Sequence, residues 1–488
     1  MKNALYLILS ILIFSHLHCK KESATIDPSA LLILFSGPAQ TYYVDAAGGN
    51  DANDGLTSGT AWQSLDRVNS SRYGPGSQVL FRRDQSWRGQ LLPKSRVSYG
   101  AYGIGEKPVI MGSVSKSNST DWIDEGDSIW RCAETSPYDA GNMIFNGAAV
   151  FGFKKWTAGD CASQGDYYYD RATGELRIYS ASNPADFYTD IEIALRRHVV
   201  DYTNVSSATF ENLSVRYGAA HGFGGYNTAH ITIRGCDISY IGGGDLTMDG
   251  QNIRFGNGIE FWGRAHDHLV EGNRIWEIYD SALTNQNSSS FVRQYNITYR
   301  NNIMWNCAMS SFEYWNRPAS SSTDSIVFEH NTALYAGQGW GAPPQRPDLQ
   351  GAHVLLPWNP ARTSGIIIRN NIFYEGNLGL WMGYASEYDG VLSMDYNCWY
   401  QAADVIMRIS DISAEYTMAQ FADYQALTGL DAHSLAEDPQ FVDAASHDYR
   451  LQAPSPCIDA GTSSGVTLDF GGTPRPQGRG PDMGAYEQ

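Results

Sequence analysis

A frame of four residues decides the fold, and it reads Val270-Glu-Gly-Asn273, Tyr299-Arg-Asn-Asn302, Phe328-Glu-His-Asn331, Ile368-Arg-Asn-Asn371 and Met394-Asp-Tyr-Asn397. It extends back to Ile233-Arg-Gly-Cys236 and Phe210-Glu-Asn-Leu213, where the asparagine is replaced. Successive steps are 23, 37, 29, 29, 40 and 26 residues. Steps this irregular exclude helical-hairpin repeats, whose period is nearly constant. They favour a solenoid of stacked short strands joined by loops of variable length, which is a parallel β-helix.

The recurring asparagine has a physical use in such a stack. A buried amide can hydrogen-bond the backbone of a bend and the asparagine of the next coil, so that no polar group is left without a partner. The alternative is that these asparagines mark surface turns. The β-branched and aromatic residues that flank all five favour the ladder. We therefore predict an all-β chain built as one right-handed parallel β-helix, with a repeat core at about 200–410.

Composition agrees with an extended β solenoid and limits the partners. The chain has 488 residues, with 49 glycines, 12% aromatic and only 18% charged residues. A solenoid suits this length because each coil buries only its neighbours. The net charge of −18 argues against a nucleic-acid partner or binding to an anionic membrane surface. The last lysine is Lys155, so arginine is the only permanent cation in the repeat region. Capped β-helices are often monomers, and we expect one here.

The N-terminus is typical of an exported protein. Lys2 is followed by an apolar run and then by Cys19. This arrangement resembles a bacterial lipoprotein signal, which implies lipidation of Cys19 and a membrane attachment through that anchor alone. The alternative is an ordinary signal peptide. We predict a signal at 1–19, a tether at 20–40 and the β-helix domain at 41–488. Six further cysteines could form disulfides or act as small buried apolar residues, and no cysteine or histidine spacing indicates zinc.

Both ends of the domain resemble pectate-lyase-like β-helix enzymes. The first segment, Tyr42-Tyr-Val-Asp-Ala-Ala-Gly-Gly-Asn-Asp-Ala-Asn-Asp-Gly-Leu56, is followed by a stretch at 62–69 that would be the capping helix. Asp438-Pro-Gln-Phe-Val-Asp443 and Ser455-Pro-Cys-Ile-Asp-Ala-Gly461 resemble a closing coil within about 430–488, and 482–487 resembles the final strand. Residues 167–179 predict a hairpin, and residues 414–428 an amphipathic helix over a late coil.

Aligning the coils on the asparagine predicts a chemical face. Ten residues after the frame position come apolar residues that we expect to point inward: Phe223, Leu283, Phe312, Trp381 and Met407, with Ile259 in this place after an insertion. The residue that follows each of them should point outward. That outward column contains Glu260, Thr284 and Glu313, and two places further come Trp262, Gln286, Trp315 and Tyr384. Aromatic faces stack on sugar rings, and carboxylates bind hydroxyls or move protons.

The carboxylates fit glycoside hydrolysis. Coils about 4.8 Å apart place Glu260 and Glu313, two coils apart, roughly 9–10 Å from each other at the backbone. Inverting glycosidases separate their two carboxyl groups by about 6.5–9.5 Å. Asp280 lies on the intervening coil and could bring the pair to a retaining distance. The alternative is that these acids cap loops or pair with Arg264 and Arg317.

A long loop after Asn331 supplies further candidates. It runs from Gly339 to Asp348 and leads to His353. Loops of this kind often build the wall of a cleft on a solenoid. We therefore expect substrate contacts from this loop and its neighbours: Arg317, Trp340, Arg346, Asp348 and His353.

Three functions remain open at this stage. The motifs around Glu260, Asp280 and Glu313 also resemble bacterial β-helix proteins associated with carbohydrate breakdown, which implies a polysaccharide partner and leaves the reaction open. The first hypothesis is a cell-surface glycoside hydrolase without a cofactor. The second is a polysaccharide lyase or uronan epimerase, with calcium as a possible cofactor and Arg317, Arg346 or His353 as the base because lysine is missing. The third is a non-catalytic lipoprotein that binds glycans or matrix.

Overall fold

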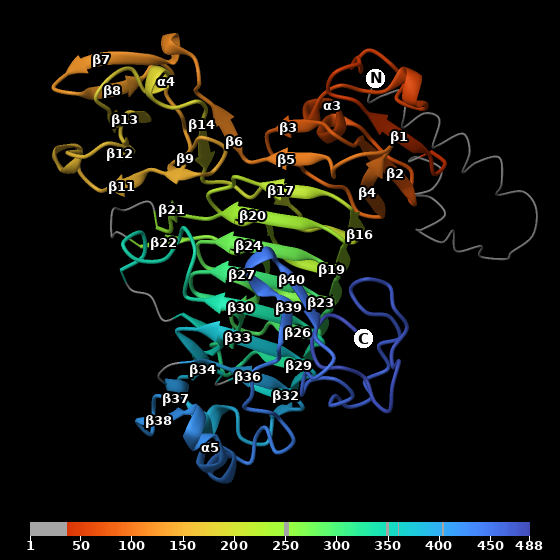
Figure 1. Ribbon diagram of the computed structural model, residues 1–488. Coiled ribbons are helices and arrows are strands. Elements are labelled where there is room, and N and C mark those ends of the chain that lie inside the picture. Colours follow the sequence, from red (N-terminus) through yellow and green to blue (C-terminus); the bar gives the residue numbers. More distant parts are fainter. Residues whose placement is uncertain (1–36, 248–252, 348–350, 360, 403–404) are drawn as a thin grey trace, which may run out of the picture.

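In a computed structural model of the 488-residue chain, the structure describes residues 37–247, 253–347, 351–359, 361–402 and 405–488. These residues form the expected parallel β-helix, with coils stacked from an N-terminal cap to a C-terminal cap and a β-rich insertion beside the first coils (Figure 1). Within these ranges, every helix is too short or too polar to cross a membrane.

Each coil contributes up to three short strands, and every stack is parallel. The first stack is β1 Thr41–Val44, β2 Ser77–Arg82, β4 Val97–Tyr102, β16 Ser206–Glu211, β19 Tyr226–Arg234, β23 Ile259–Glu271, β26 Arg293–Arg300, β29 Ser322–Glu329, β32 Arg362–Arg369 and β35 Leu392–Asp395. The second is β15 Val200–Asp201, β18 Phe223–Gly224, the start of β23, β25 Ser281–Asn287, β28 Ser310–Asn316, β31 Ala352–Leu356, β34 Leu378–Met382 and β37 Val405–Ile409. The third is β3 Ser86–Arg88, β5 Val109–Met111, β17 Ser214–Arg216, β20 Asp237–Ile241, β24 Arg274–Ile278, β27 Ile303–Cys307, β30 Thr332–Ala336, β33 Ile372–Gly376 and β36 Cys398–Tyr400.

The asparagine ladder is confirmed. Asn273, Asn302, Asn331, Asn371 and Asn397 are all fully buried. The backbone N–H of each of the first four donates to the side-chain oxygen of the next, over 2.9–3.1 Å. Each amide nitrogen also donates to a carbonyl of a neighbouring coil, as Asn302 Nδ2 does to Val270 at 3.0 Å. The ladder therefore satisfies the backbone groups that the bend between the first and third stacks would leave unpaired.

We expect Asn302→Ala to lower the free energy of unfolding by about 2–4 kcal/mol, because it leaves the Asn273 N–H and a buried carbonyl without partners. Urea unfolding of the variant measures this loss. Asn377→Ala is the control, since Asn377 is exposed between two strands of a later coil. Equal stability of the two variants would contradict the structural role of the ladder.

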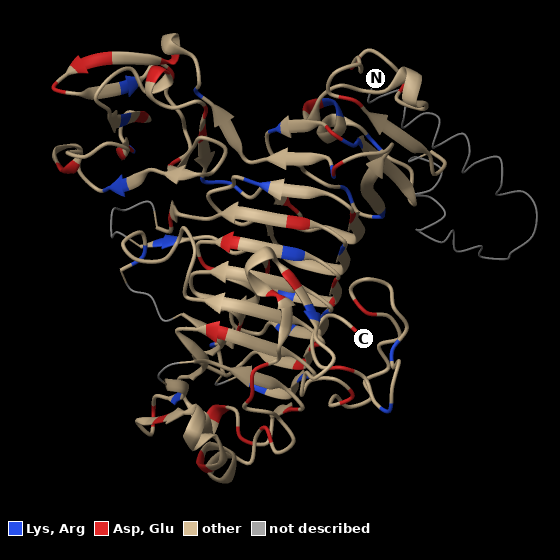
Figure 2. Cartoon of the chain, viewed as in Figure 1, with Lys and Arg blue, Asp and Glu red and all other residues tan. Residues whose placement is uncertain are grey.

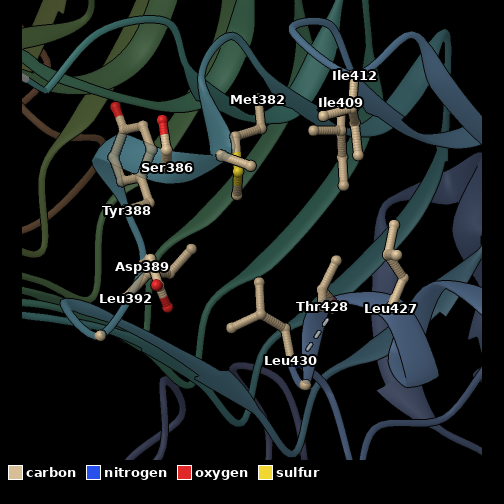
Figure 3. A pocket seen from close by; sticks show the side chains of 13 residues that line it. Met382, Ser386, Tyr388, Asp389, Leu392, Ile409, Ile412, Leu427, Thr428 and Leu430 are labelled. Atoms are coloured by element: carbon tan, nitrogen blue, oxygen red, sulfur yellow. Dashed lines mark hydrogen bonds between the residues drawn. The ribbon is translucent and has the colours of Figure 1, made fainter.

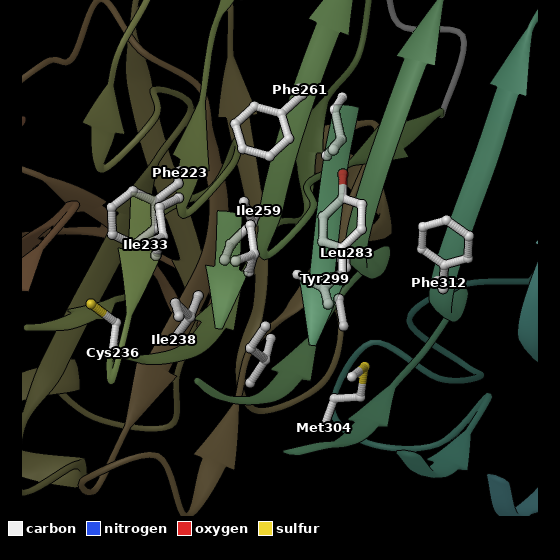
Figure 4. Packing of buried hydrophobic residues seen from close by; sticks show 14 of the residues in the cluster. Phe223, Ile233, Cys236, Ile238, Ile259, Phe261, Leu283, Tyr299, Met304 and Phe312 are labelled. Atoms are coloured by element: carbon white, nitrogen blue, oxygen red, sulfur yellow. The ribbon is translucent and has the colours of Figure 1, made fainter. Parts of the chain in front are cut away.

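The core column confirms one part of the alignment and corrects another. Phe223, Ile259, Leu283 and Phe312 lie in register and point inward (Figure 4). The column continues through Val354 and Leu380 to Met407, so the prediction that Trp381 points inward is wrong. A single residue, Asn377, separates β33 from β34, whereas two residues separate β27 from β28, so the count from Asn371 is one residue out in this coil. A slip of one residue along a strand exchanges the inward and outward faces.

The caps differ in detail from the predictions. The capping helix is α3, Leu65–Ser70, and its Ser64 hydroxyl accepts a hydrogen bond from the Arg67 N–H. Residues 414–428 are only partly helical: β38, Ala414–Thr417, pairs antiparallel with β37, and α5, Phe421–Thr428, follows.

The C-terminal segment adds one parallel bridge to the third stack, between Leu435 and Cys398, but beyond it forms no closing coil, which corrects that part of the prediction. Its strands β39, Phe441–Asp443, and β40, Asp448–Leu451, pair antiparallel. Residues 482–487 contain no strand. This segment packs along the outside of the third stack, where Tyr449 and Met483 share an apolar cluster with Trp305 and Ile372. All six cysteines of the described residues are buried free thiols.

The insertion confirms the expected hairpin as its β12 and β13. Its elements are β6 Ser113–Ser115, β7 Trp122–Gly126, β8 Ile129–Cys132, β9 Ala140–Phe145, β10 Val150–Phe151, β11 Phe153–Lys155, β12 Asp166–Asp170, β13 Glu175–Tyr179, α4 Pro184–Phe187 and β14 Ile191–Leu195. A small hairpin of β21, Gly244–Asp245, and β22, Arg254–Phe255, lies against β9.

Candidate functional site

A groove of about 610 Å³ runs across the second stack, at the start of β23, β25 and β28. Its floor carries Glu260 and Trp262 from β23, Gln286 from β25, and Glu313 and Trp315 from β28. Residues of the β21–β22 hairpin and of the loop that contains Arg346 also line it. The outward face predicted from the sequence is therefore the floor of a real groove.

The predicted register of the two glutamates is confirmed. Glu260 pairs with Thr284, which pairs with Glu313, so the glutamates lie two coils apart on one face. Trp262, Gln286 and Trp315 form a parallel row in the same register. Thr284 is fully buried between the two acids, and its hydroxyl has no hydrogen-bond partner among the described residues. Thr284 thus lies beneath the floor and does not line the groove.

Glu260 is held as a carboxylate by an imidazole. The Asn257 backbone N–H donates to His221 Nδ1 at 2.9 Å, which places the ring proton of a neutral His221 on Nε2. Nε2 then donates to Glu260 Oε2 at 2.6 Å. Burial raises the pKa of Glu260, but its interactions with His221 and the hydrogen bond from Asn257 outweigh burial and hold that pKa below its usual range.

A second imidazole lies behind the first. His198 stacks on His221 with ring centroids 4.8 Å apart. Its Nδ1 accepts the His221 backbone N–H at 3.3 Å. Burial, followed by the electrostatic interaction with His221, lowers the pKa of His198 to about 4, so its ring is neutral near pH 7. The two rings form a rigid support that keeps Glu260 in place.

Glu313 is held in the opposite protonation state. Its Oε2 accepts hydrogen bonds from Ser281 Oγ at 2.8 Å and from Gln286 Nε2 at 2.7 Å. Its Oε1 accepts only the Trp315 indole N–H, at 3.1 Å. Burial, followed by the charge of Asp280, raises the pKa of Glu313 to about 8. Because Oε2 already accepts two donors, the proton belongs on Oε1.

Asp280 lies on the intervening coil and pairs with an arginine. Its Oδ1 is 3.0 Å from Arg346 Nη1, which also donates to the Tyr279 carbonyl at 3.2 Å. The predicted contribution of the long loop to the groove is therefore confirmed for Arg346. The Asp280 charge acts on Glu313, as its raised pKa shows.

Three tryptophans form the aromatic part of the groove. Trp262 and Trp315 meet edge to face at 5.6 Å, and Trp315 and Trp358 do so at 6.2 Å. The Arg317 guanidinium lies 5.3 Å from the Trp315 ring and 4.4 Å from the Trp358 ring. These rings offer flat apolar faces beside the carboxylates, as sugar binding requires.

Other predicted contacts lie elsewhere, and three of them are corrected. Trp340 is buried against Phe151 and Tyr279, so its ring cannot serve as a stacking surface. His353 is buried in β31 with Nδ1 at 3.0 Å from Ser311 Oγ and cannot be a base. Tyr384 follows β34 outside the groove, because the alignment of its coil was off by one. Asp348 and Cys19 lie outside the described residues.

The sequence analysis missed part of the site. His221 stands two residues before the inward Phe223, so counting back along the column could have found it. His198 and Trp358 carried no such signal, because His198 precedes the first frame and Trp358 follows a long loop that interrupts the count from Asn331.

A second cavity, of about 540 Å³, lies between the last coils and α5 (Figure 3). It is lined mostly by apolar side chains such as Met382, Ile409 and Leu430, and Asp389 is its only carboxylate. It lacks the paired acids of the groove and is not a candidate for the same chemistry.

The fold and the groove together define a class: a right-handed parallel β-helix protein with two buried carboxyl groups on the floor of a surface groove. A family model described as right handed beta helix region matches residues 193–340. Lacto-N-biosidase from Bifidobacterium longum subsp. longum is 34% identical over 109 residues, which are 20% of this chain and 7% of that protein. The chain thus spans only a small part of the length of this curated relative.

Solved structures with a similar arrangement include three carbohydrate-active proteins. Pectate lyase Pel9A has a TM-score of 0.46 at 12% identity over 93% of this chain and 97% of that chain. A glycoside hydrolase has a TM-score of 0.45 at 9% identity over 76% and 95%. Lacto-N-biosidase from Eubacterium ramulus has a TM-score of 0.34 at 15% identity over 77% and 66%.

Proposed function

We propose that the protein is a carbohydrate-active enzyme, and specifically a glycoside hydrolase that cleaves a polysaccharide in the groove of the second stack. One observation carries this proposal: two buried glutamates lie two coils apart on one face of the groove, with the pKa of Glu260 held below its usual range and that of Glu313 raised to about 8. Acid and base catalysis by two carboxyl groups needs this difference. The class of the curated relative, lacto-N-biosidase, agrees with it.

The proposed reaction breaks the bond between the anomeric carbon and the glycosidic oxygen. Glu313 donates its Oε1 proton to that oxygen as the bond breaks. Glu260 removes a proton from a water molecule, whose oxygen attacks the anomeric carbon from the opposite side. The spacing of two coils leaves room for this water and favours inversion. Asp280 is a positioning residue in this scheme, because its charge keeps the proton on Glu313.

The remaining groove residues bind and orient the sugar. Trp262, Trp315 and Trp358 stack on its apolar faces. Gln286 lines the groove but donates its amide to Glu313, so its main role is to orient the acid. Arg346 holds Asp280 in the same way.

One observation favours a polysaccharide lyase as the second candidate. No hydrogen bond or ion pair of the Arg317 guanidinium is present among the residues that the structure describes, and this group lies over two groove tryptophans. It could neutralise a uronate carboxylate, with or without calcium. The binding-only alternative does not explain why the two glutamates differ in protonation. Export and a lipid anchor on Cys19 stay part of the proposal.

The first experiment incubates the protein with a polysaccharide panel and measures two products. New reducing ends without ultraviolet absorbance support the hydrolase. Calcium-dependent ultraviolet absorbance from an unsaturated sugar would instead support the lyase. Binding without turnover on any polymer supports the glycan-binding alternative.

The pH profile of kcat/KM is expected to be bell-shaped. Activity rises with pH as Glu260 ionises. This acidic limb lies below about pH 4.5, the ordinary pKa of a glutamate, because the pKa of Glu260 is depressed from that value. Activity falls near pH 8 as Glu313 loses its proton. Initial rates at low substrate concentration across pH 3–10 test this (~0.5 unit steps). A rate that keeps rising above pH 9 would contradict Glu313 as the acid.

A further inference from the structure

We propose that His230, His266 and Asp267 form a binding site for a divalent transition metal, with Zn²⁺ as the best match. The site lies at a coil corner, between the β19 coil that supplies His230 and the β23 coil that supplies the other two. It is separate from the groove chemistry and does not depend on the proposed hydrolase.

The three ligand atoms are already gathered. All lie within 4.8 Å of one another, and no other such group of three is found among the residues that the structure describes. Asp267 Oδ2 is 2.7 Å from His266 Nδ1 and 3.7 Å from His230 Nε2. Two ligands of tetrahedral zinc, each at about 2.0–2.1 Å, lie roughly 3.3 Å apart, between these two values. His230 is 60% exposed, so its ring can make the small remaining approach.

Neighbouring residues orient two of the ligands. Asn296 Nδ2 donates to Asp267 Oδ1 at 2.6 Å, which leaves Oδ2 directed at the imidazoles. The His266 ring stacks on Tyr295 with centroids 4.6 Å apart and 4° between the planes. Outer partners of this kind, which fix ligand orientation, are the usual support of metal sites.

The backbone of the corner suits two of the three ligands. The corner positions of successive coils, Ser207, His230, Asp267, Asn296 and Ser325, all have positive φ between 51° and 58°. Apart from glycine, the residues that adopt this conformation most readily are asparagine, aspartate and histidine. The corner backbone therefore accommodates His230 and Asp267 on adjacent coils.

Two imidazoles and one carboxylate make borderline ligands, which favour Zn²⁺, Ni²⁺ or Cu²⁺ over Ca²⁺ or Mg²⁺. With three protein ligands, a fourth position stays open to water. The bound ion would tie two adjacent coils together on the strand that also carries Glu260 and Trp262.

Isothermal titration of the full chain, purified without a histidine tag, with ZnSO₄ tests the proposal. A variant with His230→Asn and His266→Asn is expected to lose one binding site. His433→Asn is the matched control: His433 Nδ1 is 2.8 Å from Asp395 and stacks on Tyr396, but this pair has no second imidazole. His16 and His18 near the N-terminus contribute equally to all proteins.

Asn296→Ala keeps all three ligands and is expected to weaken Zn²⁺ binding by about 10–100-fold. Zn²⁺ should also raise the melting temperature of the wild type and of His433→Asn, but not of the double variant. Should the double variant fail to fold, His230→Asn alone replaces it, because that side chain is largely exposed. Equal zinc stoichiometry in the wild type and the variant that lacks His230 and His266, or no zinc binding by the wild type, would overturn the proposal.

Discussion

Replacement of Glu313 by glutamine should lower kcat/KM on a natural polysaccharide by about 10³-fold, or ~4 kcal/mol of transition-state stabilisation. Glutamine keeps the size of the side chain but cannot donate the proton that the leaving oxygen needs. Reducing-end assays of the purified variant measure the loss. Glycosides with a good leaving group, such as nitrophenolate, need little protonation, so on these substrates the loss should be much smaller.

Two controls separate chemistry from folding. Glu329→Gln removes another buried carboxylate, which pairs with Arg369 outside the groove, and should keep wild-type turnover.

The raised pKa of Glu313 also predicts how the stability of the protein depends on pH. The stability that neutral Glu313 contributes is fully present below its unfolded pKa, about 4.3, and is lost as the pH rises to about 8. Glu313→Gln should therefore be at least as stable as the wild type at pH 8. A variant that is inactive and strongly destabilised there would contradict this assignment.

Replacement of Glu260 by glutamine should cost a similar factor, about 10³, for a different reason. The water molecule loses the base that removes its proton, and a good leaving group does not compensate for that. The loss should therefore be equal on polysaccharides and on nitrophenyl glycosides. Comparison of the two variants on both substrates assigns acid and base. The assignment is wrong if Glu260→Gln recovers on the activated substrate and Glu313→Gln does not.

His221 gives this assignment a graded test. His221→Asn removes the imidazole that depresses the pKa of Glu260. The acidic limb of the pH profile should move upward, with the alkaline limb unchanged because Glu313 keeps its own partners. A change in kcat/KM without movement of the acidic limb would show that His221 has only a structural role.

The charge pattern of the stacks explains why few other acidic residues are candidates for the catalytic acid. Coloured by charge, the strands in view carry scattered acidic and basic residues and are otherwise uncharged (Figure 2). In the first stack, acidic and basic residues alternate from coil to coil through Glu211, Arg234, Glu271, Arg300, Glu329 and Arg369. Several pair across neighbouring coils, as Glu271 does with Arg300 and Glu329 with Arg369. Among the residues that the structure describes, no arginine forms an ion pair with Glu313, and burial together with the charge of Asp280 raises its pKa.

The sequence alone determined the fold and the face of the site. The asparagine frame sets the coil, because a buried amide at one bend must meet its equivalent in the next coil. Strand alternation then set the column of Glu260, Thr284 and Glu313, because the period of a strand is two residues. This reasoning failed at Trp381, because the turn between β33 and β34 is one residue shorter than the equivalent turn of earlier coils.

Only the tertiary structure decided which groups act. Whether Trp340 lies open or buried depends on the insertion that packs against it through Phe151, and no local pattern reports that contact. His221 and Glu260 lie on two adjacent coils of different length, and only the stacking of these coils brings the two side chains into contact. The protonation of Glu313 depends on burial and on the nearby charge of Asp280. Burial and electrostatic interaction act through space between residues far apart in the chain, so they follow from the folded arrangement and not from the order of residues.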